Sequence, residues 1–229
     1  PDVDQVDING KAILFESGIY AKIPTDLPEK LALSALDVAG APAQTAKLVK
    51  PGDTVLIIGA GGKSGMLCCY EAMKRAGVTG KVIGLCHSQK SADRLKTLGF
   101  CHTVFTADAT QPVPVMEKIS ELTGGQMCDV TINNVNIPDT EMTSILCTKN
   151  DGVVYFFSMA TSFTKAALGA EGVGSDVTMI VGNGYTKGHA EITLQELREN
   201  EALRKIFTDL SVLAAFAITY YTNKSSNEN

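Results

Sequence analysis

The sequence has no tryptophan, no Cys-x-x-Cys pair and no run of basic residues. With a formal net charge of −5, it lacks the cationic surface through which proteins bind nucleic acid. No apolar stretch approaches the roughly 20 residues that cross a membrane as a helix. The longest one near the C-terminus is only Val212–Thr219. We therefore expect neither a nucleic-acid partner nor a membrane span.

The chain also lacks a secretory signal peptide and an initiator methionine, so we interpret Pro1 as a processed or truncated start. Its six cysteines lie mostly in apolar runs, which predicts small buried side chains in a reducing, cytoplasmic setting. Two dipeptides, Cys86-His87 and Cys101-His102, contain possible metal ligands. They fall at opposite ends of neighbouring expected strands, roughly 15–20 Å apart, so we predict no metal site.

The 229 residues, 45% of them hydrophobic, suffice for one large domain. From Asp53 onward, short apolar runs alternate with amphipathic ones, and this alternation predicts an α/β fold with a doubly wound, parallel, six-stranded sheet. The expected strands span 54–58, 81–86, 102–106, 128–132, 152–157 and 176–181. The expected helices span 64–76, 91–98, 113–123, 139–148 and 189–207, with Ser91 and Asp139 as N-caps.

Residues 1–52 stand outside this alternation. Asn9-Gly10 is a hairpin signal, and short strands are expected over 12–15 and 19–23. Helical patterns follow over 31–39 and 44–49. We expect a β-rich segment that helices connect to the sheet.

The most informative segment is the turn Gly59-Ala60-Gly61-Gly62-Lys63-Ser64-Gly65, which follows an apolar strand and opens a helix. Glycines let the backbone approach a ligand, and the start of a helix supplies free N–H groups with a partial positive charge. We therefore predict a pyrophosphate site. Counted from Ala60, the pattern is Ala-x-Gly-x-x-Gly, which places Gly65 in the first helical turn against the strand.

Three other interpretations of this turn were weighed against that one. Gly62-Lys63-Ser64 imitates the end of a phosphate-binding P-loop, but such a loop needs a glycine where Ile57 stands. A class I methyltransferase uses a similar turn, but it usually has an acid at the end of its second strand, and residues 85–90 contain none. The turn can also connect strand and helix without binding any ligand.

The passage Ala39–Gly65, AGAPAQTAKLVKPGDTVLIIGAGGKSG, resembles the start of the cofactor domain of medium-chain dehydrogenases/reductases. Further likeness, to an amino-acid dehydrogenase branch of that superfamily, lies in Lys63–Gly77, Val153–Gly174 and Asp176–Glu199. The resemblance covers roughly residues 8–208. It implies a remnant of a GroES-like catalytic domain at 1–28, a bridging helix at 29–52, a Rossmann domain at 53–208 and a divergent C-terminal tail at 209–229.

Two departures from the superfamily pattern matter. Most of the GroES-like catalytic domain that precedes the cofactor domain is absent from this sequence. Zinc-dependent members also carry a cysteine ligand in the bridging helix, where this chain has Asp37-Val38-Ala39. We therefore expect no catalytic zinc.

The same resemblance implies NAD as the cofactor. An NAD site usually has an acid at the end of its second strand to bind the ribose. Here Ser88, Lys90 and Arg94 favour a 2′-phosphate instead, so NADP stays open. The residues expected to contact the cofactor are Gly59, Ala60, Gly61, Gly62, Lys63, Ser64, Gly65, Met66, His87, Ser88, Asn133, Ser158, Met159 and Asn183.

The reaction that the resemblance implies is oxidative deamination of a small-molecule substrate, a diamino acid, to the 3-keto acid. The protein then orients the reacting carbon against the nicotinamide and supplies a base. Tyr185 and Asp37 are the candidates for that base in this chain, and the missing domain is another source. The alternative is a stand-alone regulatory domain that binds NAD(H) without catalysis. Related enzymes also pair through the strand here at Asp176–Gly182, so we expect a homo-oligomer.

Overall fold

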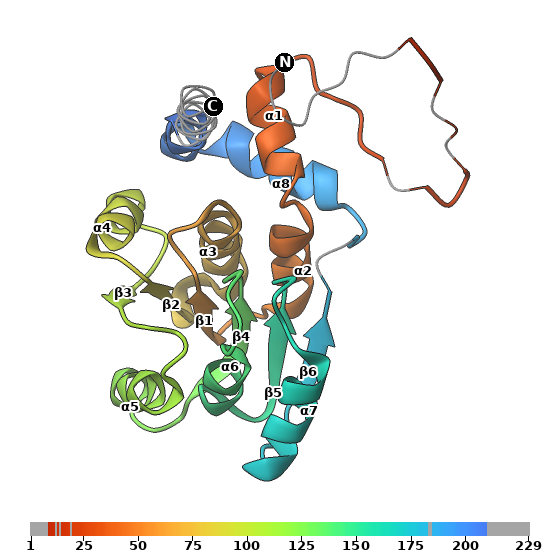
Figure 1. Ribbon diagram of the computed structural model, residues 1–229. Helices are drawn as coiled ribbons and strands as arrows, with labels where there is room; N and C mark the ends of the chain where they lie inside the picture. Colours follow the sequence, from red (N-terminus) through yellow and green to blue (C-terminus); the bar gives the residue numbers. More distant parts are fainter. Residues whose placement is uncertain (1–8, 12, 14, 19, 183–184, 210–229) are drawn as a thin grey trace, which may run out of the picture.

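A computed structural model describes residues 9–11, 13, 15–18, 20–182 and 185–209. Six strands form one sheet in which every pair is parallel, in the order β3-β2-β1-β4-β5-β6 (Figure 1). The strands are β1 (Thr54–Ile58), β2 (Lys81–Cys86), β3 (Thr103–Thr106), β4 (Cys128–Asn133), β5 (Thr148–Phe156) and β6 (Thr178–Val181). This is the doubly wound sheet that the sequence predicts.

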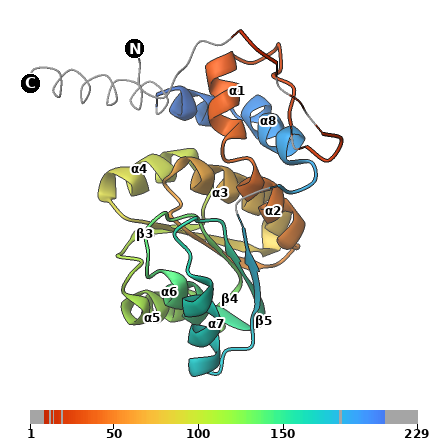
Figure 2. The same cartoon turned by 45° about the vertical axis from the view of Figure 1, so that its right-hand side comes forward.

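The helices lie in layers on both faces of the sheet (Figures 1 and 2). Helices α2, α3 and α4 cover one face, α5, α6 and α7 cover the other, and α1 and α8 lie beyond α2 and α3. Their bounds are α1 (Glu29–Leu36), α2 (Gly40–Leu48), α3 (Lys63–Ala76), α4 (Gln89–Leu98), α5 (Pro112–Thr123), α6 (Glu141–Leu146), α7 (Phe163–Gly172) and α8 (His189–Glu199). A short 3-10 turn, η1 (Gly77–Thr79), precedes β2.

The apolar strands bury both of their faces, as a parallel sheet between two helix layers requires. Val55 and Ile57 of β1 pack in the core shared with α3, whereas Leu56 and Ile58 pack in the core shared with α5. All four side chains have 0% exposure. Strand β1, which lies between β2 and β4, is therefore covered on both faces.

The strand order reverses between β1 and β4. From β1 the chain moves outward to β2 and β3, then returns to pair β4 with the other side of β1. In sheets of this kind the ends of the strands at that reversal leave a crevice where ligands bind. The glycine-rich turn follows β1 at this edge, and Asn134 follows β4.

Two helices and one strand differ from the elements that the sequence predicts. Helix α7 was not predicted at all, because the segment from Phe163 to Gly172 contains two glycines and only a weak apolar stripe. Helix α8 ends at Glu199, earlier than the expected 189–207, because the backbone at Asn200 is extended before a second helical stretch over 201–209. Strand β5 begins earlier than expected, at Thr148, with an irregular register opposite β4.

The expected strands before the sheet are absent from the described residues. Residues 13, 15 and 20–23 are irregular, and Ala12, Leu14 and Ile19 lie outside the described part. Two helices do occupy the connecting segment, though their bounds are shifted to 29–36 and 40–48. The expected tail at 209–229 also lies outside the described residues, apart from Asp209.

Helix α8 packs against the segment that leads into the sheet (Figure 2). It contacts α1, α2 and α3. Arg198 of α8 makes a bidentate ion pair with Asp26, with N···O distances of 2.7 and 3.0 Å. The chain before β1 and the chain after β6 thus lie side by side.

Candidate functional site

The glycine-rich turn is anchored to the sheet at its start. The N–H groups of Gly59 and Ala60 both donate to the Leu85 carbonyl of β2, each at 3.0 Å. Gly59 has a φ of +79°, in the region where only glycine is unstrained. The chain therefore leaves β1 in a tight turn that a side chain at this position would strain.

Gly65 is the glycine that lets helix α3 pack directly on the turn. A Cβ atom added there would lie 2.1 Å from the Gly59 carbonyl oxygen and 2.7 Å from the Ala60 Cα. Both are backbone atoms that cannot rotate away. This contact supports the Ala-x-Gly-x-x-Gly pattern counted from Ala60, because Gly65 occupies the position that the pattern reserves for close packing of helix and strand.

The start of helix α3 presents free hydrogen-bond donors. No side chain caps the helix at Gly62. Within the part of the chain that the structure describes, the backbone N–H groups of Lys63, Ser64 and Gly65 have no recorded acceptor. The Lys63 ammonium lies beside them and donates to the Ser34 hydroxyl of α1 at 3.4 Å. A helix start with these donors and an adjacent cation is suited to an anionic group such as a pyrophosphate.

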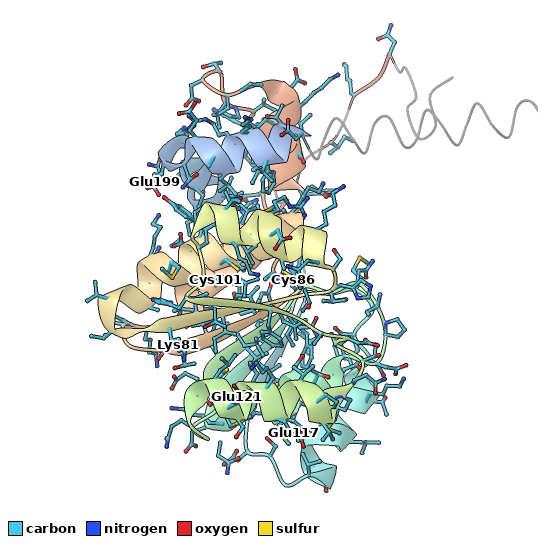
Figure 3. The ribbon with its side chains drawn as sticks, turned by 90° about the vertical axis from the view of Figure 1, so that its left-hand side faces the viewer. Lys81, Cys86, Cys101, Glu117, Glu121 and Glu199 are labelled. Carbon is cyan, nitrogen blue, oxygen red and sulfur yellow. The ribbon has the colours of Figure 1, made fainter. Side chains whose placement is uncertain are left out.

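Helix α4 holds the middle of the turn from the adjacent side. The Arg94 guanidinium donates to the Gly61 carbonyl, and its Nε is buried without a recorded partner among the described residues. The Cys86 thiol accepts hydrogen bonds from Ser91 and from the Gly61 backbone, which oppose the rise in its pKa caused by burial. Figure 3 shows Cys86 between helix α4 and the sheet. The turn therefore has its conformation before any ligand binds.

The end of β2 differs from expectation in which serine caps helix α4. Ser88, rather than Ser91, is the N-cap, and the two residues form a reciprocal capping box. The Ser88 hydroxyl accepts from the Ser91 N–H at 3.3 Å. Ser88 is thus committed to the helix, while His87 beside it and Lys90 after it are exposed.

The two asparagines at the end of β4, Asn133 and Asn134, differ in what their side-chain amides contact. Asn133 is fully buried: its amide donates to the Thr140 hydroxyl at 2.8 Å and to Ser144 at 3.0 Å, and its oxygen accepts from the Val135 N–H. Both polar atoms of its side chain are thus engaged within the protein. The amide nitrogen of Asn134, by contrast, is buried without a recorded partner in the described residues. Sequence reasoning missed it because two adjacent asparagines cannot be distinguished by pattern.

The remaining candidates divide into three groups. Met66 has a side chain with 0% exposure, and its N–H donates to the Gly62 carbonyl. Ser158 is half-buried, and its hydroxyl accepts from the Ala160 N–H at 3.0 Å. Met159 beside it is 82% exposed at the same edge of the sheet. Asn183 lies outside the described residues.

The two candidate bases are not brought together. Asp37 is exposed at the end of α1, and no contact with Tyr185 is recorded in the described part of the chain. Tyr185 is 55% exposed, and its ring meets that of His189 edge-on at 5.1 Å. Both rings line an open hollow of about 1300 Å³ between residues 16–24, α3 and α8.

The residues of the described chain do not form a zinc site. No three of their histidine, cysteine, aspartate and glutamate side chains lie close enough to hold a metal ion. The His102 Nδ1 accepts from the Val82 N–H at 2.9 Å, so this ring is used by the backbone. Cys86 is buried, and Cys101 is half-buried next to β2.

The helices of the described residues include none with the length and apolar character that a bilayer crossing requires. The sheet order, the turn after β1 and the uncapped start of α3 together define an α/β protein of the Rossmann type, in which a nucleotide-like anion fits the reversal of the strand order.

Comparison with known proteins makes the assignment more specific. The zinc-binding dehydrogenase family matches residues 65–180, and the chain belongs to this family. It is 66% identical over 207 residues to L-erythro-3,5-diaminohexanoate dehydrogenase of Acetoanaerobium sticklandii, which covers 90% of this chain and 60% of the relative. The enzyme of that name from Fusobacterium nucleatum is 60% identical over 210 residues, covering 92% and 61%.

The chain thus spans about 60% of the length of the curated relatives that it matches. Among solved structures, a mycobacterial quinone oxidoreductase superposes with a TM-score of 0.62 at 18% identity. The match covers 84% of this chain and 64% of that one. At this identity the likeness concerns the fold alone, and it agrees with the resemblance to medium-chain dehydrogenases/reductases that the sequence indicates.

Proposed function

We propose that this chain is the cofactor-binding part of an NAD-dependent dehydrogenase that oxidatively deaminates a diamino acid, with L-erythro-3,5-diaminohexanoate as the substrate. The observation that carries the cofactor assignment is the uncapped start of α3 behind the Gly59–Gly65 turn. The substrate assignment rests on the 60–66% identity to enzymes named for that activity. The family match supports the dehydrogenase chemistry.

The residues of this chain fit a dinucleotide in defined roles. The N–H groups of Lys63, Ser64 and Gly65, with the Lys63 ammonium, would hold the pyrophosphate. The amide nitrogen of Asn134, which has no recorded partner among the described residues, follows β4 and would lie between that site and the nicotinamide end. Met159 would cover the ring from the end of β5 as an apolar side chain.

We favour NAD over NADP because the polar groups near the ribose end are already occupied. Arg94 donates to the Gly61 carbonyl, and Ser88 caps helix α4. A 2′-phosphate would have to compete with these bonds for the engaged Arg94 nitrogen and the Ser88 hydroxyl, which leaves the exposed His87 and Lys90 beside them. A ribose with a free 2′-hydroxyl needs no such rearrangement.

The balanced reaction converts an ammonium-bearing carbon, NAD and water into a ketone, an ammonium ion, NADH and a proton. The bound nicotinamide supplies the hydride acceptor. The protein has to remove a proton from the amine and shield the reacting carbon from competing water. Tyr185 and Asp37 remain our candidates for that base within this chain, since both side chains are exposed.

The direct test is a titration of the chain with NADH and, separately, with NADPH. Nicotinamide fluorescence reports binding without interference from protein tryptophan, because the sequence has none. We expect saturable enhancement with NADH and about tenfold weaker binding for Lys63→Met, which removes one charge-assisted contact. Lys47→Met, an exposed residue at the end of α2, is the matched control and leaves the affinity unchanged. A folded chain that binds neither cofactor contradicts the proposal.

The whole enzyme's organisation follows from the same proposal. Residues 1–28 would belong to a catalytic domain, residues 29–52 would bridge to the 53–208 cofactor domain, and 209–229 would form a separate tail. Strand β6 pairs only with β5 among the described residues, so one of its edges is open to a second copy of the chain. We propose a homo-oligomer built through that edge.

A further inference from the structure

Two carboxyl groups are buried together between helices α3 and α8. Glu71 of α3 and Glu196 of α8 each have 0% exposure. Ionised carboxylates are almost never fully buried unless they are paired with cations or strong donors. The groups around the two carboxyls must therefore compensate any negative charge that the pair carries.

The two glutamates have unequal partners. Glu71 accepts from the Arg75 guanidinium at 2.7 Å and lies 3.5 Å from the Lys74 ammonium. Neither oxygen of Glu196 has a hydrogen-bond partner within the described part of the chain. Two cations therefore lie against Glu71, whereas no donor is within hydrogen-bond distance of the Glu196 oxygens among the described residues.

The surroundings of Glu196 make ionisation more costly still. Burial, and then the negative charge of Glu71, raise the pKa of Glu196 well above its usual value. Lys74 opposes this effect, but it is shared with Glu199 at 2.8 Å, and that contact lowers the pKa of Glu199. Figure 3 labels Glu199 on α8, above the helix layer. The titratable groups that face Glu196 are Cys68, Tyr70, Glu71, Lys74 and Arg75 of α3, and Glu199 of α8.

Helices α1 and α2 also pack on α8, but neither contributes to the charges recorded around Glu196 among the described residues. We propose that Glu196 is a neutral carboxyl while α8 is docked on α3, and that its ionisation as the pH rises, with the proton passing to water, loosens this contact. Protonation of Glu196 would thus control how firmly α8 packs on α3, at a place separate from the cofactor site.

Loosening of α8 would also affect the loop before it, which carries the candidate base Tyr185. Helix α8 begins at His189, directly after the loop that carries Tyr185 and Thr186. Thr186 donates to the buried Gln44 of α2 at 3.0 Å, which holds this loop next to the helix layer. When α8 loosens, the loop loses the support of the helix that follows it.

The sign of the pH effect follows from the raised pKa. The folded state disfavours the ionised carboxyl, so the stabilisation is complete below 4.5, the ordinary value for glutamate. It falls as the pH rises above that value and is lost once the pH passes the pKa of Glu196 in the folded chain. Docking of α8 is thus strongest at acid pH and weakens as the pH rises.

The experiment is hydrogen exchange of α8 amides, read by mass spectrometry across pH and corrected for intrinsic exchange. One released proton changes the opening equilibrium by up to about tenfold per pH unit. We expect this loss of protection in the wild type and its disappearance in Glu196→Gln, which mimics the neutral carboxyl. Glu191→Gln is the matched control: it removes a charge from an exposed position on α8 and keeps the wild-type slope.

Equal slopes in the wild type and Glu196→Gln would overturn the proposal. If the Glu196→Gln chain fails to fold, the wild type labelled with carboxyl-¹³C glutamate decides the matter. One glutamate resonance that titrates far above the others supports a neutral Glu196. Ordinary titration of every glutamate in the folded chain refutes it.

Discussion

Gly65→Ala is the substitution with the sharpest expected effect, because the new Cβ would lie 2.1 Å from the Gly59 carbonyl oxygen. The atoms in conflict belong to the backbone of the turn, so helix α3 or the turn itself must move. Overpacking of this kind costs about 1–3 kcal/mol, and the contact is at the severe end. Alanine regains about 0.5–1 kcal/mol as a better helix former. The net loss is therefore about 2 kcal/mol.

The assay is thermal unfolding followed by far-ultraviolet circular dichroism, together with NADH fluorescence. For a chain of this size a loss of about 2 kcal/mol lowers Tm by about 4–8 °C, and displacement of the turn abolishes cofactor binding. Gly172→Ala is the matched control, since Gly172 also lies in a helix and has no atom within 4 Å of an added Cβ. It should hold or raise Tm. A Gly65→Ala chain as stable as Gly172→Ala, with NADH binding intact, would refute the packing argument.

Three further predictions concern separate parts of the molecule. Ser88→Ala removes the cap of α4 and should cost about 1 kcal/mol, seen as a lower Tm with the NADH-over-NADPH preference unchanged; a switch to NADPH would contradict our account of the ribose end. In the native chain, alkylation followed by mass spectrometry should label the half-buried Cys101 before Cys68, since burial raises the pKa of Cys68 to about 12; equal rates at pH 9 would contradict the buried position. Sedimentation should give a multiple of 24.3 kDa if copies pair along β6, and a monomer at working concentration argues against that edge.

The sheet could be predicted from the sequence because burial on both faces leaves little choice. A strand such as β1, buried on both sides, has to be continuously apolar, and glycine has to follow it where helix α3 packs at contact distance. Each requirement fixes the type of residue at a single position, so it can be recognised in the sequence. The register that ends on Gly65 was predictable for that reason.

Features that depend on a choice between adjacent polar residues cannot be recognised in this way. Ser88 and Ser91 both suit a helix cap, and only the backbone at the end of β2 decides that Ser88 is the cap. Asn133 and Asn134 are adjacent at the end of β4, but a one-residue step directs the first to α6 and leaves the amide nitrogen of the second without a recorded partner among the described residues.

Helix α7 was missed because its amphipathic signal is weak. Ala166 and Ala170 are its buried residues, and alanine fills the contact with the sheet without marking an apolar stripe. Phe163 and Leu168 point the other way and are 71% and 64% exposed, so the largest side chains mark the wrong face. Tertiary packing of a small-residue face, rather than local pattern, makes this segment helical.

The hydrogen bond between Thr186 and Gln44 joins two points that are 142 residues apart in the chain. All six strands lie between these two residues in the sequence, so the segment that carries the sheet has ends that contact each other. Asp26 and Arg198 close the same junction a little further out. A graft of the segment that carries the sheet between relatives would therefore have to match the side chains that meet across this junction, including those of α3 that contact α1 and α8.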